Sequence, residues 1–264
     1  MQQNSDKKAE LCDEKAFLDK VYSTYTVDHS SQTRVMRELV VRTISPYLRG
    51  GRGLELGCSD GYITKMLAAR LDMLDVVDGS KNFLDAAKKH KLPNVKYTYS
   101  LFEEYTSTTR YDYVFASYIL EHVLEPAPVL KMARTILKDD GLLFVIVPNA
   151  RALSRQLAMH MGLVADLKAL TDNDLAHGHR RVYDRIYLNR ELAAAGFDTV
   201  AEGGIMLKIL ADFKLDKLID DGMLQDSHID GLYRLGLEYP DLCGTLFSVC
   251  RPALNAGQVS VNIP

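Results

Sequence analysis

A short strand that ends in a glycine turn and leads directly into a helix constrains the fold of this chain most strongly. Residues 53–57 (GLELG) form an apolar run, Gly61 follows, and Ile63, Met66 and Leu67 then recur at helical spacing. The glycines permit a tight turn and a close approach of the main chain to a ligand, because they have no Cβ atom. The first amide groups of the helix can face a negatively charged group. The segment therefore predicts a ligand site at a strand-to-helix turn.

Strands and helices alternate along most of the chain. Apolar runs predict strands at 53–57, 74–78, 95–99, 111–117, 142–147, 198–201 and 244–250. Helical periodicity covers 33–47, 63–70, 83–90, 126–138 and 187–195, and residues 207–239 are expected to be mostly helical. Because a crossover between parallel strands needs a helix packed on the sheet, the pattern predicts an α/β fold. The expected architecture is doubly wound and Rossmann-like, with a mostly parallel seven-stranded sheet and a helical substrate cap; Asp139-Asp140-Gly141 is expected to be a turn.

A single domain with insertions, 1–264, accounts for this organisation better than two domains, since no linker or repeat interrupts the sequence. Its expected parts are an N-terminal helical lid at 16–48, a cofactor-binding core at 49–149, a substrate-cap insertion at 150–186, and the C-terminal half of the sheet with inserted helices at 187–251. The helices at 207–239 are assigned either to the lid or to a homodimer contact, and both assignments stay open.

Composition excludes some partners. A net charge of −3 and the absence of a basic run give no indication that the chain binds nucleic acid or a membrane surface. No apolar run approaches the roughly 18 residues of a membrane-spanning helix. The four cysteines show no metal-binding spacing, and the N-terminus does not have the apolar core of a secretion signal. We therefore expect a soluble, cytoplasmic protein that acts on a small molecule.

Asp78 ends the second predicted strand, 21 residues after Gly57, where a carboxylate can accept hydrogen bonds from both hydroxyls of a ribose. A dinucleotide oxidoreductase is a weak alternative, because Ser59 and Tyr62 replace two glycines of the G-x-G-x-x-G pattern. A serine hydrolase is a second alternative, because residues 57–61 match G-x-S-x-G with Ser59 as nucleophile. Only a helical stretch precedes this strand, whereas hydrolase elbows follow several strands.

Four segments in order, LELGCSDG, DVVDGS, FASYILEHVLEP and LKDDGLLFVIVPN, resemble the motif series of class I S-adenosylmethionine-dependent methyltransferases over roughly residues 50–150. The resemblance implies S-adenosyl-L-methionine as cofactor. The residues that it implies in cofactor binding are Glu55, Gly57, Ser59 and Gly61 at the methionine, Asp78 at the ribose, Gly79, Ser80 and Phe102 at the adenine, Ser117 and Tyr118 on the far side, and Tyr25 in a lid. Ser59 replaces the middle glycine of the turn, and we expect it to be tolerated if it avoids positive φ.

The acceptor site is expected near the insertion. Methyl transfer requires alignment of acceptor, methyl group and sulfur, and an alcohol acceptor must also lose its proton. His122, His177 and His179 are therefore candidate bases with an ordinary pKa of about 6.5, and His122 is expected nearest the methyl group. Arg180, Arg181 and Tyr183 are candidate substrate contacts. For His177 and His179, anion binding, a solvated loop and a metal site with Glu121 and His122 are alternatives, and no metal is expected.

The predicted function is methyl transfer to a small-molecule acceptor, at a hydroxyl oxygen of a sugar or natural-product intermediate, with nitrogen and carbon acceptors as alternatives. A serine hydrolase that uses Ser59 and a non-catalytic adenosyl-binding regulatory protein are the alternatives.

Overall fold

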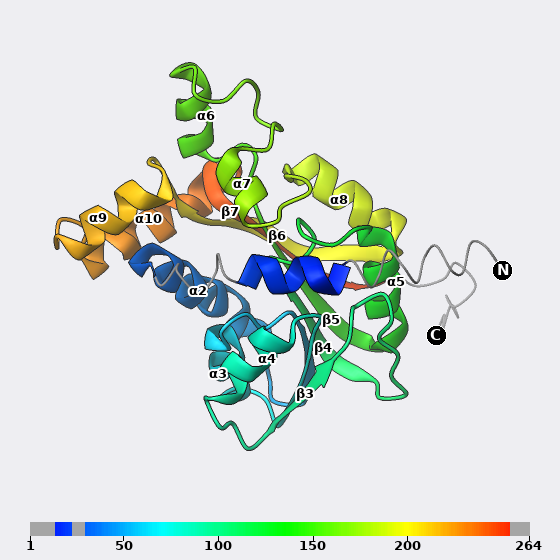
Figure 1. Cartoon of the computed structure of the whole chain (residues 1–264). Helices are drawn as coiled ribbons and strands as arrows, with labels where there is room; N and C mark the ends of the chain where they lie inside the picture. Colours follow the sequence, from blue (N-terminus) through cyan, green and yellow to red (C-terminus); the bar gives the residue numbers. More distant parts are fainter. Residues whose placement is uncertain (1–13, 23–29, 254–264) are drawn as a thin grey trace, which may run out of the picture.

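Seven β-strands form one sheet in the part of the chain that this computed structural model describes, residues 14–22 and 30–253 (Figure 1). The strands are β1 (Arg52–Leu56), β2 (Met73–Asp78), β3 (Val95–Tyr99), β4 (Tyr111–Ser117), β5 (Leu137–Pro148), β6 (Phe197–Leu207) and β7 (Cys243–Pro252). Their order is β3-β2-β1-β4-β5-β7-β6. Strand β7 runs antiparallel to β5 and β6, and the remaining neighbours pair in parallel. The predicted doubly wound, mostly parallel sheet is confirmed.

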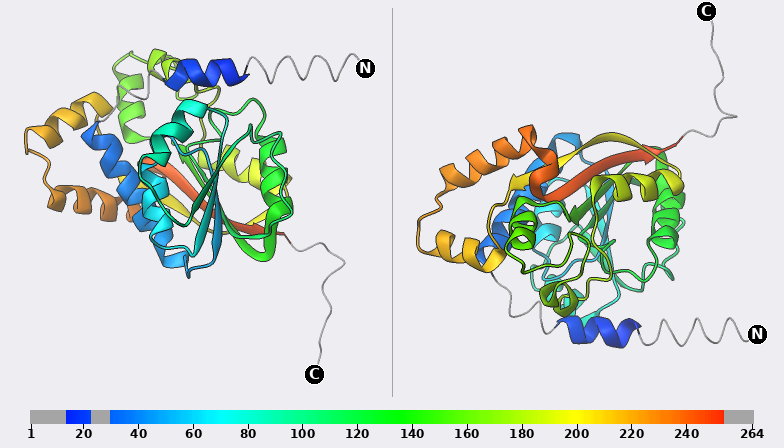
Figure 2. Two further views of the ribbon diagram at one scale, coloured as in Figure 1. Left: turned by 60° about the horizontal axis from the view of Figure 1, so that its bottom comes forward. Right: turned by 90° about the horizontal axis from the view of Figure 1, so that it is seen from above.

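Helices cover both faces of the sheet (Figure 2). They are α2 (Ser31–Ile44), α3 (Tyr62–Ala68), α4 (Lys81–Lys88), α5 (Pro126–Ile136), α8 (Arg185–Ala194), α9 (Asp212–Asp220) and α10 (Asp226–Glu238). Neighbouring residues of β4 enter different cores: Phe115 packs with α2, α3 and α4, whereas Val114 and Ala116 pack with α5 and α8. Because both faces are covered, the central strands are apolar at successive positions.

Strand β5 is longer than the apolar pattern predicts. It begins at Leu137, which pairs with Tyr111 ahead of an irregularity in the β4–β5 register. The segment Asp139-Asp140-Gly141, expected to be a turn, therefore lies inside the strand. Its two aspartates are exposed, so their polarity is compatible with a strand end.

Strand β6 also extends beyond its expected end at Ala201, to Leu207. Gly203 and Gly204 interrupt the apolar pattern but continue the strand. A Cβ atom at Gly204 would collide with the carbonyl oxygen of Pro240, so the glycine reflects a close approach of another part of the chain.

Two segments far apart in the sequence lie at the carboxyl end of the parallel strands: the helical residues 14–22, and residues 150–184 with α6 (Leu153–His160) and α7 (Asp172–Ala176) (Figures 1 and 2). The two segments contact each other, since Arg180 donates a hydrogen bond to the carboxylate of Glu14 at 2.7 Å. Within residues 14–22 and 30–253, none of the helices is both long and apolar enough to cross a bilayer.

Candidate functional site

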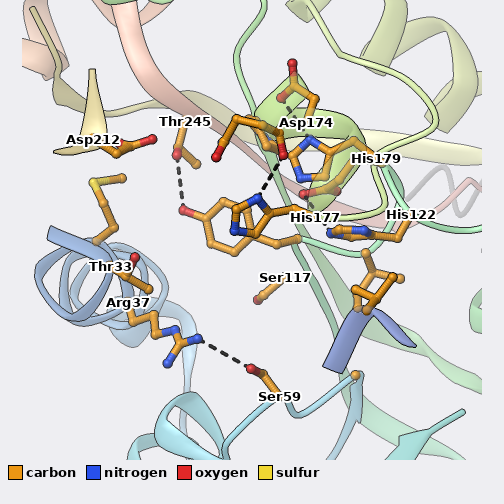
Figure 3. Close-up of a pocket in the computed structure, with 18 of the residues that line it drawn as sticks. Thr33, Arg37, Ser59, Ser117, His122, Asp174, His177, His179, Asp212 and Thr245 are labelled. Carbon is orange, nitrogen blue, oxygen red and sulfur yellow. Dashed lines mark hydrogen bonds and ion pairs between the residues drawn. The ribbon is translucent and has the colours of Figure 1, made fainter. Parts of the chain in front are cut away.

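A cavity of about 850 Å³ lies at the carboxyl ends of the central strands (Figure 3). Residues that line its cofactor side, next to the glycine turn, include Glu55, Gly57, Ser59, Asp78, Gly79 and Phe102. Residues that line its acceptor side include Glu121, His122, His177 and His179. A single cavity therefore joins most of the predicted cofactor residues to the three predicted catalytic histidines.

The glycine turn between β1 and α3 needs its glycines. Gly57 and Gly61 have φ values of 73° and 83°, in the left-handed region. A side chain at Gly57 would collide with Ile119, and a Cβ atom at Gly61 would lie 2.8 Å from the Cα atom of Ala87. Gly57 faces the cavity, whereas Gly61 shapes the turn from outside it.

The start of α3 does not present all of its amide groups to a ligand, contrary to the sequence-based expectation. The main-chain amide of Tyr62 donates a hydrogen bond to the carboxylate of Asp60 at 3.0 Å. The site therefore has to bind its ligand mainly through the side chains and main chain of the turn and of the neighbouring strand ends.

Ser59 has a φ value of 48°, so the condition under which we expected it to be tolerated is not met. Such a backbone conformation costs a non-glycine residue about 1–3 kcal/mol, and surrounding contacts must maintain it. Arg37 of α2 supplies them: its guanidinium donates a hydrogen bond to the Ser59 hydroxyl at 3.4 Å and forms an ion pair with Asp60 at 2.9 Å.

This environment does not support Ser59 as a hydrolase nucleophile. Among the described residues, the hydrogen-bond partner of its hydroxyl is Arg37, a cation that cannot accept a proton. The cavity histidines His122, His177 and His179 lie at the other end (Figure 3). A serine nucleophile needs a base at about 2.6–3.2 Å.

Asp78 is almost fully buried at the end of β2 and joins two turns. Its Oδ2 atom accepts a hydrogen bond from the main-chain amide of Cys58 at 2.9 Å, and its Oδ1 atom accepts one from that of Ser80 at 2.8 Å. Burial raises the pKa of the carboxyl group, and these main-chain hydrogen bonds oppose the shift. The Cys58 thiol also donates a long hydrogen bond to Oδ2 at 3.6 Å. A carboxylate has about four acceptor positions, so Oδ1 can accept one further hydrogen bond, and a ligand donor can replace the thiol at Oδ2.

Glu55 of β1 is also buried, with 2% of its surface exposed. Its Oε2 atom has no hydrogen-bond partner among the described residues. Burial raises the pKa of the carboxyl group from 4.5 to about 8. A buried carboxyl group that lines a cavity and has an unpaired oxygen can bind a cation or a hydrogen-bond donor of a ligand.

The residues predicted at the adenine agree only in part with the residues that line the cavity. Gly79 and Phe102 line the cavity, whereas Ser80 does not. The Ser80 hydroxyl caps α4 and donates a hydrogen bond to Asp19 at 3.1 Å, so Ser80 supports this wall from behind. Tyr25, expected in the lid, lies outside the described residues.

Ser117 and Tyr118 follow β4 and close the cavity between its two sides. The Ser117 hydroxyl is buried and has no partner among the described residues. Tyr118 has a φ value of 59°, and its hydroxyl lies 3.1 Å from that of Thr245. Burial raises the pKa of Tyr118, so it is protonated at neutral pH.

The three histidines differ in their surroundings. The ring planes of His122 and His179 are nearly perpendicular, and their ring centroids lie 4.7 Å apart. The ring centroid of His177 lies 6.5 Å from that of His179. Burial and the neighbouring His179 lower the pKa of His122 to about 3. The expectation of an ordinary pKa is therefore wrong for His122, which is a poor base at neutral pH.

Glu121 lies beside these histidines with 1% of its surface exposed. Both of its carboxyl oxygens have no hydrogen-bond partner among the described residues, and burial raises its pKa to about 7. One potential ligand atom from each of Glu121, His122 and His179 lies within 4.8 Å of the others. The sequence had offered a metal site of His177 and His179 with Glu121 and His122 as an alternative, and His177 is not part of the group that the structure brings together.

Arg180, Arg181 and Tyr183 are not placed as the sequence suggested, since none of them lines the cavity. Arg180 donates to the main-chain carbonyl of His122 and to Glu14. Arg181 donates to the carbonyl oxygens of Leu120, Val123 and Leu124. Tyr183 is fully buried and donates to Glu191 at 2.8 Å. These side chains hold the insertion onto the loop that follows β4. Their polar groups therefore make contacts within the protein and do not line the cavity.

Asp174 is a site residue that sequence reasoning missed. It lies in the first turn of α7, where Thr171 and Asp174 form a capping box, and it contacts His179 at 3.1 Å. The capping box was readable from the sequence as Thr171-x-x-Asp174. The contact with His179 was not, because it depends on how the chain turns after α7.

The fold and the cavity define a methyltransferase-type α/β domain. Residues 28–202 match the family described as "Methyltransferase domain". The chain is 30% identical over 179 residues to a ubiquinone biosynthesis O-methyltransferase of Aeromonas salmonicida (strain A449), covering 66% of this chain and 74% of that protein. It is 27% identical over 119 residues to the ubiquinone biosynthesis O-methyltransferase of Glaesserella parasuis serovar 5 (strain SH0165), covering 42% and 50%.

The structure of DhpI in complex with SAH has a similar fold, with a TM-score of 0.60 at 16% identity, over 93% of this chain and 98% of that one. The chain belongs to the S-adenosylmethionine-dependent methyltransferase family, as the motif series predicted.

Proposed function

We propose that this protein transfers a methyl group from S-adenosylmethionine to a hydroxyl oxygen of a small molecule with an apolar body. The observation that carries the proposal is the single cavity that joins the acidic residues Glu55 of β1 and Asp78 of β2 to the cluster of Glu121 and the histidines. S-adenosylmethionine supplies a methyl group on a positively charged sulfur. The protein has to bind both reactants, align them and exclude water.

The cofactor side suits an adenosyl amino acid. Oδ1 of Asp78 can accept one more hydrogen bond, and at Oδ2 a ribose hydroxyl can replace the long contact of 3.6 Å with the Cys58 thiol, which matches two neighbouring hydroxyls. Glu55 provides an unpaired carboxyl oxygen for the positively charged α-amino group. Gly79 and Phe102 provide an apolar wall for the adenine ring.

The acceptor side combines apolar walls with a few polar groups. Met36, Ala158, Val164 and Phe213 give it apolar surface, and the polar residues of the cavity include Asn173, Lys208 and Asp212 besides Glu121 and His179. A sugar would leave many hydroxyl groups against these apolar side chains, so a ring with one or two hydroxyl groups fits better. The ubiquinone biosynthesis O-methyltransferases among the relatives favour oxygen as the methylated atom.

A panel of acceptors tests the proposal. The purified protein is incubated with S-adenosylmethionine carrying a ¹³C-methyl group and, separately, with phenols, catechols, sugars and primary amines. We expect a labelled methyl ether from a phenol or catechol, detected by mass spectrometry and by the carbon chemical shift of the methyl group. Labelling of amines alone would show that the acceptor atom is nitrogen and overturn the oxygen assignment.

A further inference from the structure

We propose that His179 is the general base of this reaction and that Asp174 is the residue that positions it. The assignment rests on the proposed transfer to a hydroxyl oxygen. It selects one of three candidate histidines and adds a residue whose role the sequence did not indicate.

Asp174 is held firmly as an ionised carboxylate. Its Oδ2 atom accepts hydrogen bonds from the main-chain amide and the hydroxyl of Thr171, at 2.8 and 2.7 Å. Arg155 donates to the same atom at 3.2 Å. Together with the hydrogen bond to His179, these contacts keep the pKa of Asp174 well below its ordinary value. The carboxylate can therefore only accept hydrogen bonds.

This contact determines the state of His179. Its Nδ1 atom lies 3.1 Å from Oδ1 of Asp174, so Nδ1 is the nitrogen that carries the hydrogen. In the neutral ring, Nε2 then has the lone pair. The His179 side chain is 14% exposed and lines the cavity, which leaves it accessible to an acceptor. The pair has the arrangement in which a carboxylate fixes the tautomer of a catalytic histidine.

The other two histidines are less suited to take the proton. The Nε2 atom of His122 lies 4.0 Å from Oε1 of Glu121, which is a longer contact than the 3.1 Å between His179 and Asp174, and burial also lowers the pKa of the His122 ring. His177 directs Nδ1 to the main-chain carbonyl of Asn173 at 2.8 Å, and a neutral carbonyl stabilises an imidazolium less than a carboxylate does. Glu121 is more deeply buried than His179, with side-chain exposures of 1% and 14%, so it is less accessible to an acceptor.

In the proposed step, the O–H bond of the acceptor breaks, and its proton moves to Nε2 of His179. The acceptor oxygen forms a bond to the methyl carbon while the methyl–sulfur bond breaks, and that electron pair stays on sulfur. The positive charge passes from sulfur to the imidazolium, which lies next to the carboxylate of Asp174, and His179 later releases the proton to solvent.

Kinetics of matched variants test the assignment. We expect His179→Gln to lower kcat by about 10²–10⁴-fold, while the Kd for S-adenosylhomocysteine changes by less than about threefold. Asp174→Asn should lower kcat by tenfold or more without raising KM equally, because an amide does not fix the tautomer. His228→Gln, at the start of α10, is the control, since it alters a histidine whose Nδ1 accepts a main-chain hydrogen bond outside the cavity. Near-normal kcat in His179→Gln with a large loss in Glu121→Gln would make Glu121 the base.

A second measurement does not depend on an acceptor. Nitrogen-15 NMR of the histidine rings, assigned through the signal lost in His179→Gln, should show the Nδ1–H tautomer in the wild type and a mixture in folded Asp174→Asn. The same tautomer in both proteins would overturn the role of Asp174. If the wild type methylates no hydroxyl acceptor, the proposed function fails, whereas this result still stands.

Metal analysis provides the remaining comparison, because Glu121, His122 and His179 are close enough to be ligands. We expect kcat to survive dialysis against a chelator. Stoichiometric zinc in the wild type that is lost in His179→Gln, with activity restored by Zn²⁺ alone after chelation, would overturn the base assignment in favour of a metal site.

Discussion

Asp78 and Cys58 are joined by a hydrogen bond of 2.9 Å between the carboxylate at the end of β2 and a main-chain amide of the glycine turn after β1. The bond ties together the two strand ends that face the cofactor side of the cavity. Because the second carboxylate oxygen is held by the amide of Ser80, the orientation of Asp78 is fixed before any ligand binds. Such preorganisation favours binding of two ribose hydroxyls.

Replacement of Asp78 tests this part of the site. We expect Asp78→Asn to weaken S-adenosylhomocysteine binding by tenfold or more, since hydrogen bonds to a charged group contribute about 1.5–3 kcal/mol. Asp85→Asn, an exposed aspartate on α4, is the matched control. Calorimetric titration of both folded variants is the measurement, and equal affinities would remove the ribose role from Asp78.

Cofactor binding should depend on pH through Glu55. With a pKa near 8, Glu55 is mostly protonated at pH 6–7, and pairing with an α-amino group requires the ionised form. Affinity for S-adenosylmethionine should therefore rise with pH between 6 and 7.5, by up to about tenfold per unit. A Glu55→Gln variant should bind more weakly and show a nearly flat profile. A flat profile in the wild type would mean that Glu55 does not receive the cation.

The same shift affects stability. The folded protein binds a proton on Glu55 that the unfolded chain has already lost above its ordinary pKa of 4.5. The contribution of Glu55 to the free energy of unfolding therefore falls as pH rises from about 4.5 to 8. Without cofactor, Glu55→Gln should lose less stability than the wild type over this range, as followed by urea unfolding at several pH values.

Ser59 separates methyl transfer from hydrolysis. Ser59→Ala removes only a long hydrogen bond of 3.4 Å with Arg37, so we expect kcat for methyl transfer to change by less than about threefold. The measurement is run beside an esterase assay with an activated ester. An esterase activity in the wild type that Ser59→Ala abolishes would restore the hydrolase alternative.

The sequence predicted the sheet well because burial on both faces leaves a direct signal in strands such as β4 and β5. It predicted β6 poorly, because Gly203 and Gly204 break the apolar pattern: Gly203 lies against the ring of Phe247, and Gly204 lies against the carbonyl oxygen of Pro240. The glycine turn was predicted as a ligand site, and Gly57 has the positive φ that such a turn needs. The strained φ of Ser59 was not predictable, because Arg37 supports it from another helix.

The acceptor side was harder to predict for a physical reason. In the segment HGHRRVY, the residue types indicate which chemistry is possible, but they do not indicate which side chains point into the cavity. His179 points into the cavity, whereas Arg181 points at the main chain of the loop after β4. The partner that distinguishes His179 from His177 is Asp174, and its contact depends on the turn after α7. Only the three-dimensional structure connects these residues.

Turnover measured as formation of S-adenosylhomocysteine tests the central claim most directly, because it separates an enzyme from a protein that only binds the adenosyl group. S-adenosylhomocysteine and methylated acceptor are quantified together after incubation of the protein with S-adenosylmethionine and the best acceptor of the panel. We predict one S-adenosylhomocysteine for each methyl ether formed, with many turnovers per protein and a strong loss in His179→Gln. Tight binding of S-adenosylmethionine without S-adenosylhomocysteine formation in the presence of any acceptor would contradict the account and identify a non-catalytic binding protein.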